Sequence, residues 1–331
     1  MITTKEKFPR INKMADFFEN TAAGIAGMPK VAYWGGEENF RGNRVCIDFY
    51  KEHCRQRGIF DNHFFSSIPF ILEEECRLGA SILSYLLNKG GGHIYTLGTA
   101  EATMARTIGK LGSGDIKTFS CTPTASNLIS FNRLGIPQNS FLHIAPYCEI
   151  EISDIRKYIP AFSGFDIIVE DTTFQMYSSH RTIQIDFVKK KLKSDGIFCF
   201  IEKFNCDDPE EYLSREINKD RNFKARYFDE TSIVEKRRDV LETMGNGQVT
   251  INEFEKCLMN HFQYAAIIWN STNFYSIVAS NSKVNLLELI AGMPDAFITR
   301  EFCYLVKLPI PLYGIPEIEI PRLEREERYV V

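Results

Sequence analysis

Groups capable of acid–base chemistry gather just after one apolar segment of the chain, FDIIVE at residues 165–170. Asp171 follows this segment directly, and His180 lies a few residues further on. A carboxylate or an imidazole at such a place can orient a substrate or accept a proton, so we expect Asp171 and His180 to be catalytic. Asp171 could equally cap a turn or a helix. Tyr177 and Arg181, in the same stretch, are expected to contact a substrate.

A second apolar segment, GIFCFIE, ends on Glu202, with Lys203 beside it. Because Glu202 ends its segment, close to where the groups named above lie relative to theirs, we expect it to be a third catalytic group. The alternative is a solvated ion pair between Glu202 and Lys203 that takes no part in chemistry.

A glycine turn follows an earlier apolar segment, HIYTL at residues 93–97, and contains Gly98, Thr99, Ala100 and Glu101. A glycine just past a strand lets a ligand approach the backbone closely, and the free N–H groups of a following helix favour polar or anionic groups. We therefore expect these four residues to bind a cofactor. The alternative is a tight turn between a strand and a helix that binds nothing.

Segments of strand length alternate with helical segments through the middle of the chain. This alternation predicts an α/β fold with a doubly wound, mostly parallel sheet, right-handed crossovers and helices on both faces. Ligands bind such sheets beyond the carboxyl ends of the strands, where the residues named above lie. Five strands are predicted at residues 93–97, 116–121, 140–144, 165–170 and 196–201.

Two further apolar segments, 264–269 and 274–279, predict a hairpin that closes the edge of the sheet and brings the total to seven strands. The Pro-rich run at 308–324 is not expected to be helical. Helices are predicted at residues 68–88, 100–111, 124–134, 154–158, 181–193 and 285–291.

The unit around Gly98, the segment FDIIVEDTTF and the segment LKSDGIFCFIE resemble motifs I, IV and V–VI of the class I S-adenosylmethionine (SAM) dependent methyltransferases. The predicted hairpin is similar to the sixth and seventh strands of that family. The resemblance lies in order and pattern, over roughly residues 68–204 and 263–281. It implies SAM as the cofactor, bound by Gly98, Thr99, Ala100, Glu101, Cys121, Thr122 and Glu170.

The resemblance also implies a division of the chain around a SAM-binding, Rossmann-like core. Five parts are expected: an N-terminal helical cap or lid at 1–88, the core at 89–204, a helical insertion that caps the substrate at 205–262, closing strands at 263–281 and a C-terminal appendage at 282–331.

Acidic residues are missing where the family usually has them. The acid two positions before the motif glycine is Thr96 here, and the acid that ends strand two and holds the ribose is Thr122 or Cys121. A third acidic position falls near Ala145. A hydroxyl cannot match a carboxylate that accepts two hydrogen bonds. We therefore expect weaker cofactor binding unless Glu101 supplies a carboxylate.

These features together favour SAM-dependent methyl transfer to a small or medium-sized acceptor. The alternative is a repurposed or non-catalytic member of the same fold that binds another ligand or a protein partner, which the missing acids would favour. An NAD-dependent oxidoreductase is disfavoured because the chain lacks both G-x-G-x-x-G and an acid ending strand two.

Composition limits the kinds of partner and the cellular compartment that we expect. The net charge of −4 gives no basic surplus, so nucleic acid is not the expected partner. The nine scattered cysteines form no C-x-x-C pair, which indicates a reducing compartment without disulfides or a zinc knuckle. No signal-peptide core opens the chain, and no apolar run reaches the ~18 residues of a membrane span. A cytoplasmic protein with no metal and no membrane partner is expected, and no oligomeric state follows.

One segment, ETMGNGQVTINEF, is similar to a calcium loop but places Met244 at a ligand position. A thioether offers no hard oxygen to calcium. Thr250 and Glu253 in the same segment instead predict a capping box that begins a helix.

Overall fold

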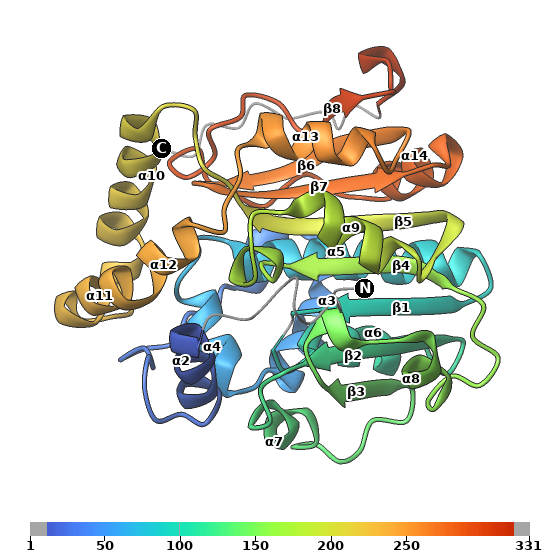
Figure 1. The fold of residues 1–331 in the computed structure, drawn as a ribbon, viewed down its shortest axis with the longest axis horizontal. Coiled ribbons are helices and arrows are strands. Elements are labelled where there is room, and N and C mark those ends of the chain that lie inside the picture. Colours follow the sequence, from blue (N-terminus) through green and yellow to red (C-terminus); the bar gives the residue numbers. More distant parts are fainter. Residues whose placement is uncertain (1–11, 99, 321–331) are drawn as a thin grey trace.

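One eight-stranded sheet forms the centre of the computed structural model, which describes residues 12–98 and 100–320 (Figure 1). Across the sheet the strands run β3-β2-β1-β4-β5-β7-β6-β8. β1 to β5 pair in parallel, whereas β7, β6 and β8 are antiparallel, so the predicted α/β fold is confirmed. The strands are β1 Gly92–Leu97, β2 Ile116–Thr122, β3 Ser140–Ile144, β4 Phe165–Asp171, β5 Leu192–Lys203, β6 Tyr264–Ser271, β7 Phe274–Ser280 and β8 Ile310–Tyr313.

The order of strands reverses at β1. β2 pairs with one side of β1 and β3 lies beyond it, whereas β4 pairs with the other side and β5 lies beyond that. At such a switch point the connections leave β1 and β4 toward opposite faces, and a crevice opens at the carboxyl ends of the two strands.

Both faces of the sheet are buried, as a parallel sheet requires. Along β5, Ile197, Cys199 and Ile201 face one apolar cluster, whereas Phe198 and Phe200 face the other. The first layer contains α3 Arg44–Gln56, α5 Ile71–Asn88, α6 Thr103–Leu111 and α14 Lys283–Ala291; the second contains α8 Ile152–Arg156, α9 Arg181–Lys189 and α13 Ile251–Met259.

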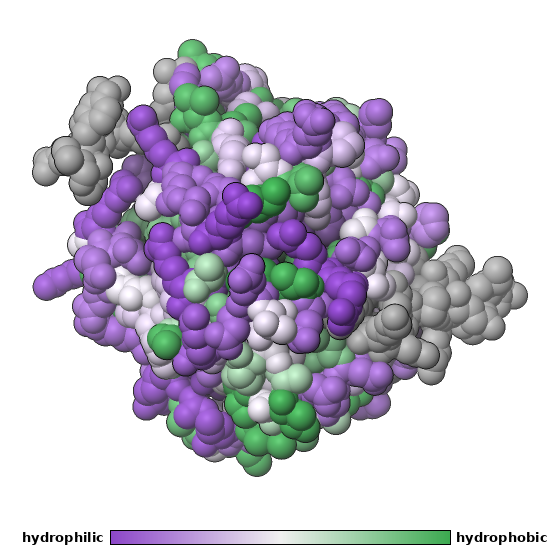
Figure 2. All heavy atoms as spheres, turned by 90° about the vertical axis from the view of Figure 1, so that its left-hand side faces the viewer, coloured by the Kyte–Doolittle hydropathy of each residue, from purple (hydrophilic) through white to green (hydrophobic). Residues whose placement is uncertain are grey.

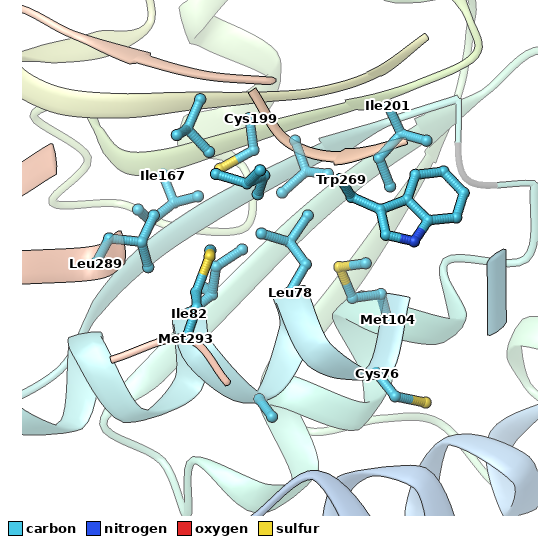
Figure 3. Close-up of a cluster of buried hydrophobic side chains, with 14 of the residues drawn as sticks. Cys76, Leu78, Ile82, Met104, Ile167, Cys199, Ile201, Trp269, Leu289 and Met293 are labelled. Atoms are coloured by element: carbon cyan, nitrogen blue, oxygen red, sulfur yellow. The ribbon is translucent and has the colours of Figure 1, made fainter. Parts of the chain in front are cut away.

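The first layer is held mainly by α5. Its apolar side chains, among them Leu78 and Ile82, pack against Ile167, Cys199 and Trp269 of the sheet (Figure 3). The three glutamates in the first turns of α5 are also buried and point to different partners. Glu74 pairs with Arg77 on the same helix at 2.7 Å, and Glu73 accepts a hydrogen bond from Asn39 Nδ2 at 2.7 Å.

The sheet has one strand more than the predicted seven. β8 pairs antiparallel with β6, so the predicted hairpin is present but does not form the edge. Pro309 and Pro311 hid this strand, because proline lacks the backbone N–H that a ladder needs. An edge strand tolerates proline because one of its sides has no partner strand.

The other predicted strands are confirmed, with β3 matching at both ends and β5 beginning earlier, at Leu192. The helix predicted at 124–134 is shorter than expected. It is α7 Asn127–Phe131, after which successive turns through Gly135 end the helical path.

The expected insertion at 205–262 consists of two different parts. α10 Pro209–Asn222, α11 Glu230–Lys236 and α12 Glu242–Gly245 lie beyond the carboxyl ends of the parallel strands, at the left of Figure 1. α13 instead packs on the sheet, where Phe254 and Leu258 join the cluster that contains Phe198. The predicted capping box of Thr250 and Glu253 begins α13.

The two ends of the first part lie side by side. Asn205 and Thr250 form an isolated parallel bridge, and the Asn205 N–H donates to the Val249 carbonyl at 2.9 Å. Replacing residues 207–247 by a short Gly-Ser linker is therefore expected to leave a core that unfolds cooperatively in urea, followed by circular dichroism.

The matched control removes residues 207–262, and α13 with them. This deletion is expected to abolish cooperative unfolding, because it exposes the apolar face that Phe254 and Leu258 cover. If the two deletions unfold alike, α13 is not part of the core.

Candidate active site

A cavity enclosing about 1180 Å³ of empty space, part of it open to solvent, lies at the carboxyl ends of the parallel strands. Gly98, Thr122, Asp171 and Lys203, which end or follow four of these strands, all line it. Aromatic side chains of α2 Asn12–Ala22 and α4 Ile59–Phe65 line it too, as do residues of α10 to α12. Figure 2 faces this end of the molecule, whose surface is largely hydrophilic.

Neighbouring residues at the end of β4 face opposite layers, because side chains alternate along a strand. Asp171 lines the cavity. Glu170 points to the second layer, where it accepts hydrogen bonds from the backbone N–H groups of Thr173 and Phe174. Glu170 therefore holds the turn after β4 and does not line the cavity.

Two more carboxylates meet Asp171 at the cavity wall, Asp61 from α4 and Glu75 from α5. Burial, and then the charge of Asp61, raises the pKa of Glu75 well above its usual range. Burial, and then the charge of Glu75, does the same to the pKa of Asp171. Burial and mutual repulsion therefore favour the protonated form of both carboxyl groups.

The surroundings of these carboxylates differ. Asp61 accepts hydrogen bonds from Thr103 Oγ1 at 2.6 Å and from the Gly58 N–H at 3.0 Å. Glu75 Oε2 lies 3.2 Å from Nε2 of His53, whose pKa burial lowers to about 4, so that this imidazole is neutral. Within the described part of the chain, no donor reaches the buried Oδ1 of Asp171.

Arg181 and Glu202 form an ion pair in the second layer, at 3.0 Å, and both side chains are fully buried. Arg181 also donates to the carbonyl of Gly247 at 2.9 Å, which ties α9 to the loop before α13. Burial raises the pKa of Glu202, and the guanidinium of Arg181 opposes that rise. The interpretation of Glu202 as catalytic and of Arg181 as a substrate contact is therefore corrected, because neither side chain lines the cavity.

Gly98 lines the cavity with φ +78°, in the left-handed region that favours glycine. A Cβ at this position would overlap Oγ1 of Thr173 and come within 2.9 Å of the Asp171 carbonyl. The contact with Thr173 alone is enough to require glycine here, so a substitution would disturb the turn whether or not a ligand binds.

The other residues of the glycine turn do not all line the cavity. Ala100 lines the cavity, and Thr99 lies outside the described residues. Glu101 is fully buried and accepts hydrogen bonds from the N–H groups of Phe60 at 2.9 Å and Asp61 at 3.2 Å, at the start of α4. Burial, and then the charge of Asp61, raises its pKa to about 7. Glu101 anchors α4 and does not supply the missing carboxylate to the cavity.

The side chains of Thr122 and Cys121 face opposite sides of the sheet, as those of Asp171 and Glu170 do. Thr122 lines the cavity, and its Oγ1 accepts hydrogen bonds from Asn127 Nδ2 at 2.9 Å and from the Thr124 N–H at 3.2 Å. Cys121 faces the second layer, where its Sγ lies 3.0 Å from the Tyr95 hydroxyl. Of the two candidates for the ribose position, only Thr122 faces the cavity.

The loop after β4 contains two further residues that the sequence suggested for the site, and one of them lines the cavity. Tyr177 lines the cavity and packs edge-on against Tyr147, with ring centroids 4.9 Å apart. His180 is exposed at the residue before α9 and is absent from the cavity wall, which corrects its expected catalytic role.

Several residues that line the cavity belong to no sequence motif from which their role could have been predicted. Asp61 and Glu75 come from helices ahead of β1, and three of the lysines in the wall come from the insertion. The one available signal was the run of three glutamates in an otherwise apolar helix, since carboxylates are rarely buried without a specific partner. The lysines in question are Lys219, Lys224 and Lys236.

Over residues 12–98 and 100–320, no group of three or more His, Cys, Asp or Glu side chains is arranged to hold a metal ion. None of the helices described has both the length and the apolar character that crossing a membrane requires.

Comparison with known proteins finds likenesses of structure alone. No protein-family model and no curated protein sequence matches the chain. The plantazolicin methyltransferase BpumL in complex with SAH is similar at 9% identity and a TM-score of 0.47, over 82% of this chain and 98% of that one. The YcgJ protein from Bacillus subtilis is similar at 14% identity and a TM-score of 0.41, over 59% and 71%.

A SAM-dependent methyltransferase from Aquifex aeolicus is similar at 13% identity and a TM-score of 0.37, over 61% of this chain and 91% of that one. At these identities and TM-scores the likenesses establish neither a family nor an activity for this chain.

The Arg181–Glu202 pair gives a test of its structural role. Arg181→Met is expected to lower the free energy of unfolding by about 3–5 kcal/mol, because it leaves a buried carboxylate without its partner. Urea denaturation measures this, and adding Glu202→Gln to Arg181→Met should recover part of the loss. Lys190→Met, in an exposed pair with Asp186, is the control and should change little. An unchanged midpoint for Arg181→Met would contradict the structural role.

Proposed function

We propose that this protein transfers a methyl group from SAM to a small or medium-sized acceptor held in the cavity. One observation carries the proposal: a wall of three carboxylates, Asp61, Glu75 and Asp171, stands beside Gly98 at the switch point of the sheet. An acidic wall at this place fits a cationic ligand, and SAM carries both an ammonium and a sulfonium group.

The carboxylates would hold the cationic part of SAM. Asp171 can accept a hydrogen bond from an ammonium through its buried Oδ1 without giving up another donor. Hydrogen bonds to charged groups contribute about 1.5–3 kcal/mol each, so two such contacts suffice to orient a ligand.

The remaining cavity residues would position the ligands and exclude water. When bound, SAM supplies a methyl group that its sulfonium has already activated. Methyl transfer then needs mainly alignment and a dry site, because no bond in the protein has to form. Phe17, Phe60 and Phe64 make the wall apolar on the side of α2 and α4. Thr122 is the proposed ribose contact.

The second candidate function is a repurposed fold that binds a different ligand. The acid missing from position 96 supports it, since Thr96 is buried and its hydroxyl pairs with Ser120 Oγ at 2.6 Å. Glu75 and Asp171 offset that loss, because they present carboxylates to the same cavity from α5 and β4.

Calorimetry with SAM separates the two candidates and yields a prediction about protons. Burial and mutual repulsion raise the pKa of both Glu75 and Asp171 in the free protein. A cation that binds beside these two carboxyl groups favours their charged form, so SAM binding is expected to release protons. The binding enthalpy should then differ between buffers of different ionisation enthalpy at the same pH. Asp171→Asn is expected to weaken SAM binding by tenfold or more and to remove the buffer dependence.

The control for this variant is Asp186→Asn, which changes an exposed carboxylate on α9. It should bind SAM as the parent does. Tight SAM binding by Asp171→Asn would mean that the ammonium is held elsewhere, and no SAM binding by the parent would favour the repurposed fold.

Thr122 gives an independent prediction about the ribose. An aspartate at 122 can still accept hydrogen bonds from Asn127 and the Thr124 N–H, and it presents a second oxygen to the cavity. Thr122→Asp is therefore expected to tighten SAM binding about tenfold, since charge-assisted hydrogen bonds exceed neutral ones by about 1 kcal/mol or more. Thr122→Asn is the uncharged control and should not tighten it. An unchanged affinity for Thr122→Asp would rule out Thr122 as the ribose contact.

A further inference from the structure

A cluster of lysines lines the cavity on the side of the insertion. Lys203 ends β5, Lys219 lies on α10, Lys224 begins the 3-10 helix η4 Lys224–Arg226, and Lys236 ends α11. The side chains of Lys203, Lys219 and Lys224 are only 1%, 2% and 3% exposed. Lysine is almost never buried to this extent without a specific partner.

The partners present inside the protein are too few for these cations. Glu216 Oε2 serves two lysines at once, Lys203 at 2.8 Å and Lys219 at 2.6 Å. Asp220 likewise serves both Lys224, at 2.9 Å, and Arg237. Two carboxylates thus serve three buried lysines and the partly exposed Arg237, before Lys236 is considered, and an unbalanced buried charge is strongly unfavourable.

The lysines respond to this imbalance as expected. Burial, opposed by Glu216, lowers the pKa of Lys219 to about 8, and burial with the charge of Lys219 lowers the pKa of Lys224 to about 8. Lys236 hydrogen-bonds His63 and Ser67 Oγ, the latter at 3.1 Å, and burial lowers its pKa well below the usual range. An anion in the cavity would supply the missing negative charge.

We propose that the lysines of this cluster form an anion-binding subsite that holds a carboxylate or phosphate group of the acceptor. This inference rests on the proposed methyl transfer for the word acceptor. The cavity wall then carries two groups of opposite charge, with carboxylates from β4, α4 and α5 for the cationic cofactor and lysines from β5 and the insertion for the anionic substrate.

A small anion fits better than a nucleic acid backbone. The lysines are buried inside the cavity, where a polyphosphate chain cannot run past them, and the chain as a whole carries a net charge of −4. Lys203 and Lys219 also lie over the ring of Phe274, at 5.8 Å and 5.4 Å from its centroid, so an apolar surface adjoins the cluster. An anionic group on an otherwise apolar small molecule matches this wall.

Titration of the full chain with sulfate and with succinate tests the subsite, with sulfate standing in for a phosphate group. At equal ionic strength, either probe is expected to bind and to raise the melting temperature, whereas sodium chloride should not. Binding of only succinate, or of only sulfate, would show whether the subsite prefers a carboxylate or a phosphate group. Either result supports the subsite. No binding of either probe would overturn the proposal.

Lys224→Met is the informative variant, because Asp220 keeps Arg237 as a partner. We expect probe binding at least tenfold weaker, with a melting temperature no lower than that of the parent, since the variant removes surplus positive charge. A merely structural lysine would lower the melting temperature when lost. If Lys224→Met fails to fold, Lys219→Met replaces it, because Glu216 then keeps Lys203.

Lys190→Met, which removes an exposed lysine on the surface, is the matched control. Equal probe binding by Lys190→Met and Lys224→Met would overturn the subsite. SAM is titrated in parallel, and SAM binding that falls with probe binding in Lys224→Met would assign the lysines to the cofactor's carboxylate, against the proposal. Probe binding without any SAM binding by the parent would overturn methyl transfer while supporting the anion subsite.

Discussion

The alternation of side chains across a sheet that is buried on both faces decides which residues can do chemistry in this protein. At the ends of β2, β4 and β5 the last two residues are both polar or reactive, and in each case the final residue faces the cavity while its neighbour faces the second layer. Thr122, Asp171 and Lys203 therefore line the cavity, whereas Cys121, Glu170 and Glu202 are held in the opposite layer. A shift of one residue in register would exchange the two sets.

The residues turned away from the cavity have a structural use. Glu170 receives the N–H groups of the turn after β4, and Glu202 pairs with Arg181, which also binds the carbonyl of Gly247. These contacts hold the loop of β4 and the start of α9 in place behind the cavity.

The insertion has two roles because the ends of its first part meet. The bridge between Asn205 and Thr250 lets α10 to α12 leave the sheet and return to the same place, so these helices can supply Lys219, Lys224 and Lys236 without disturbing the strands. α13 then covers the second face with Phe254 and Leu258. The helices that supply the lysines are therefore separate from the helix that covers the sheet.

Local patterns in the sequence were sufficient for the α/β class, the order and approximate bounds of the first seven strands, the helix α5 and the capping box at Thr250, because each depends on the periodicity or chemistry of residues close together in the chain. The same patterns pointed to Gly98, Thr122, Asp171 and Tyr177, since strand ends meet at one edge of a parallel sheet. Only the tertiary structure decided which of two adjacent residues at a strand end faces the cavity. It also decided that the Glu101 carboxylate binds backbone N–H groups of α4, and that β8 pairs with β6 despite its prolines. It alone brought Asp61, Glu75 and the lysines of the insertion to the same cavity, because their meeting depends on contacts between segments far apart in sequence, which no local pattern records.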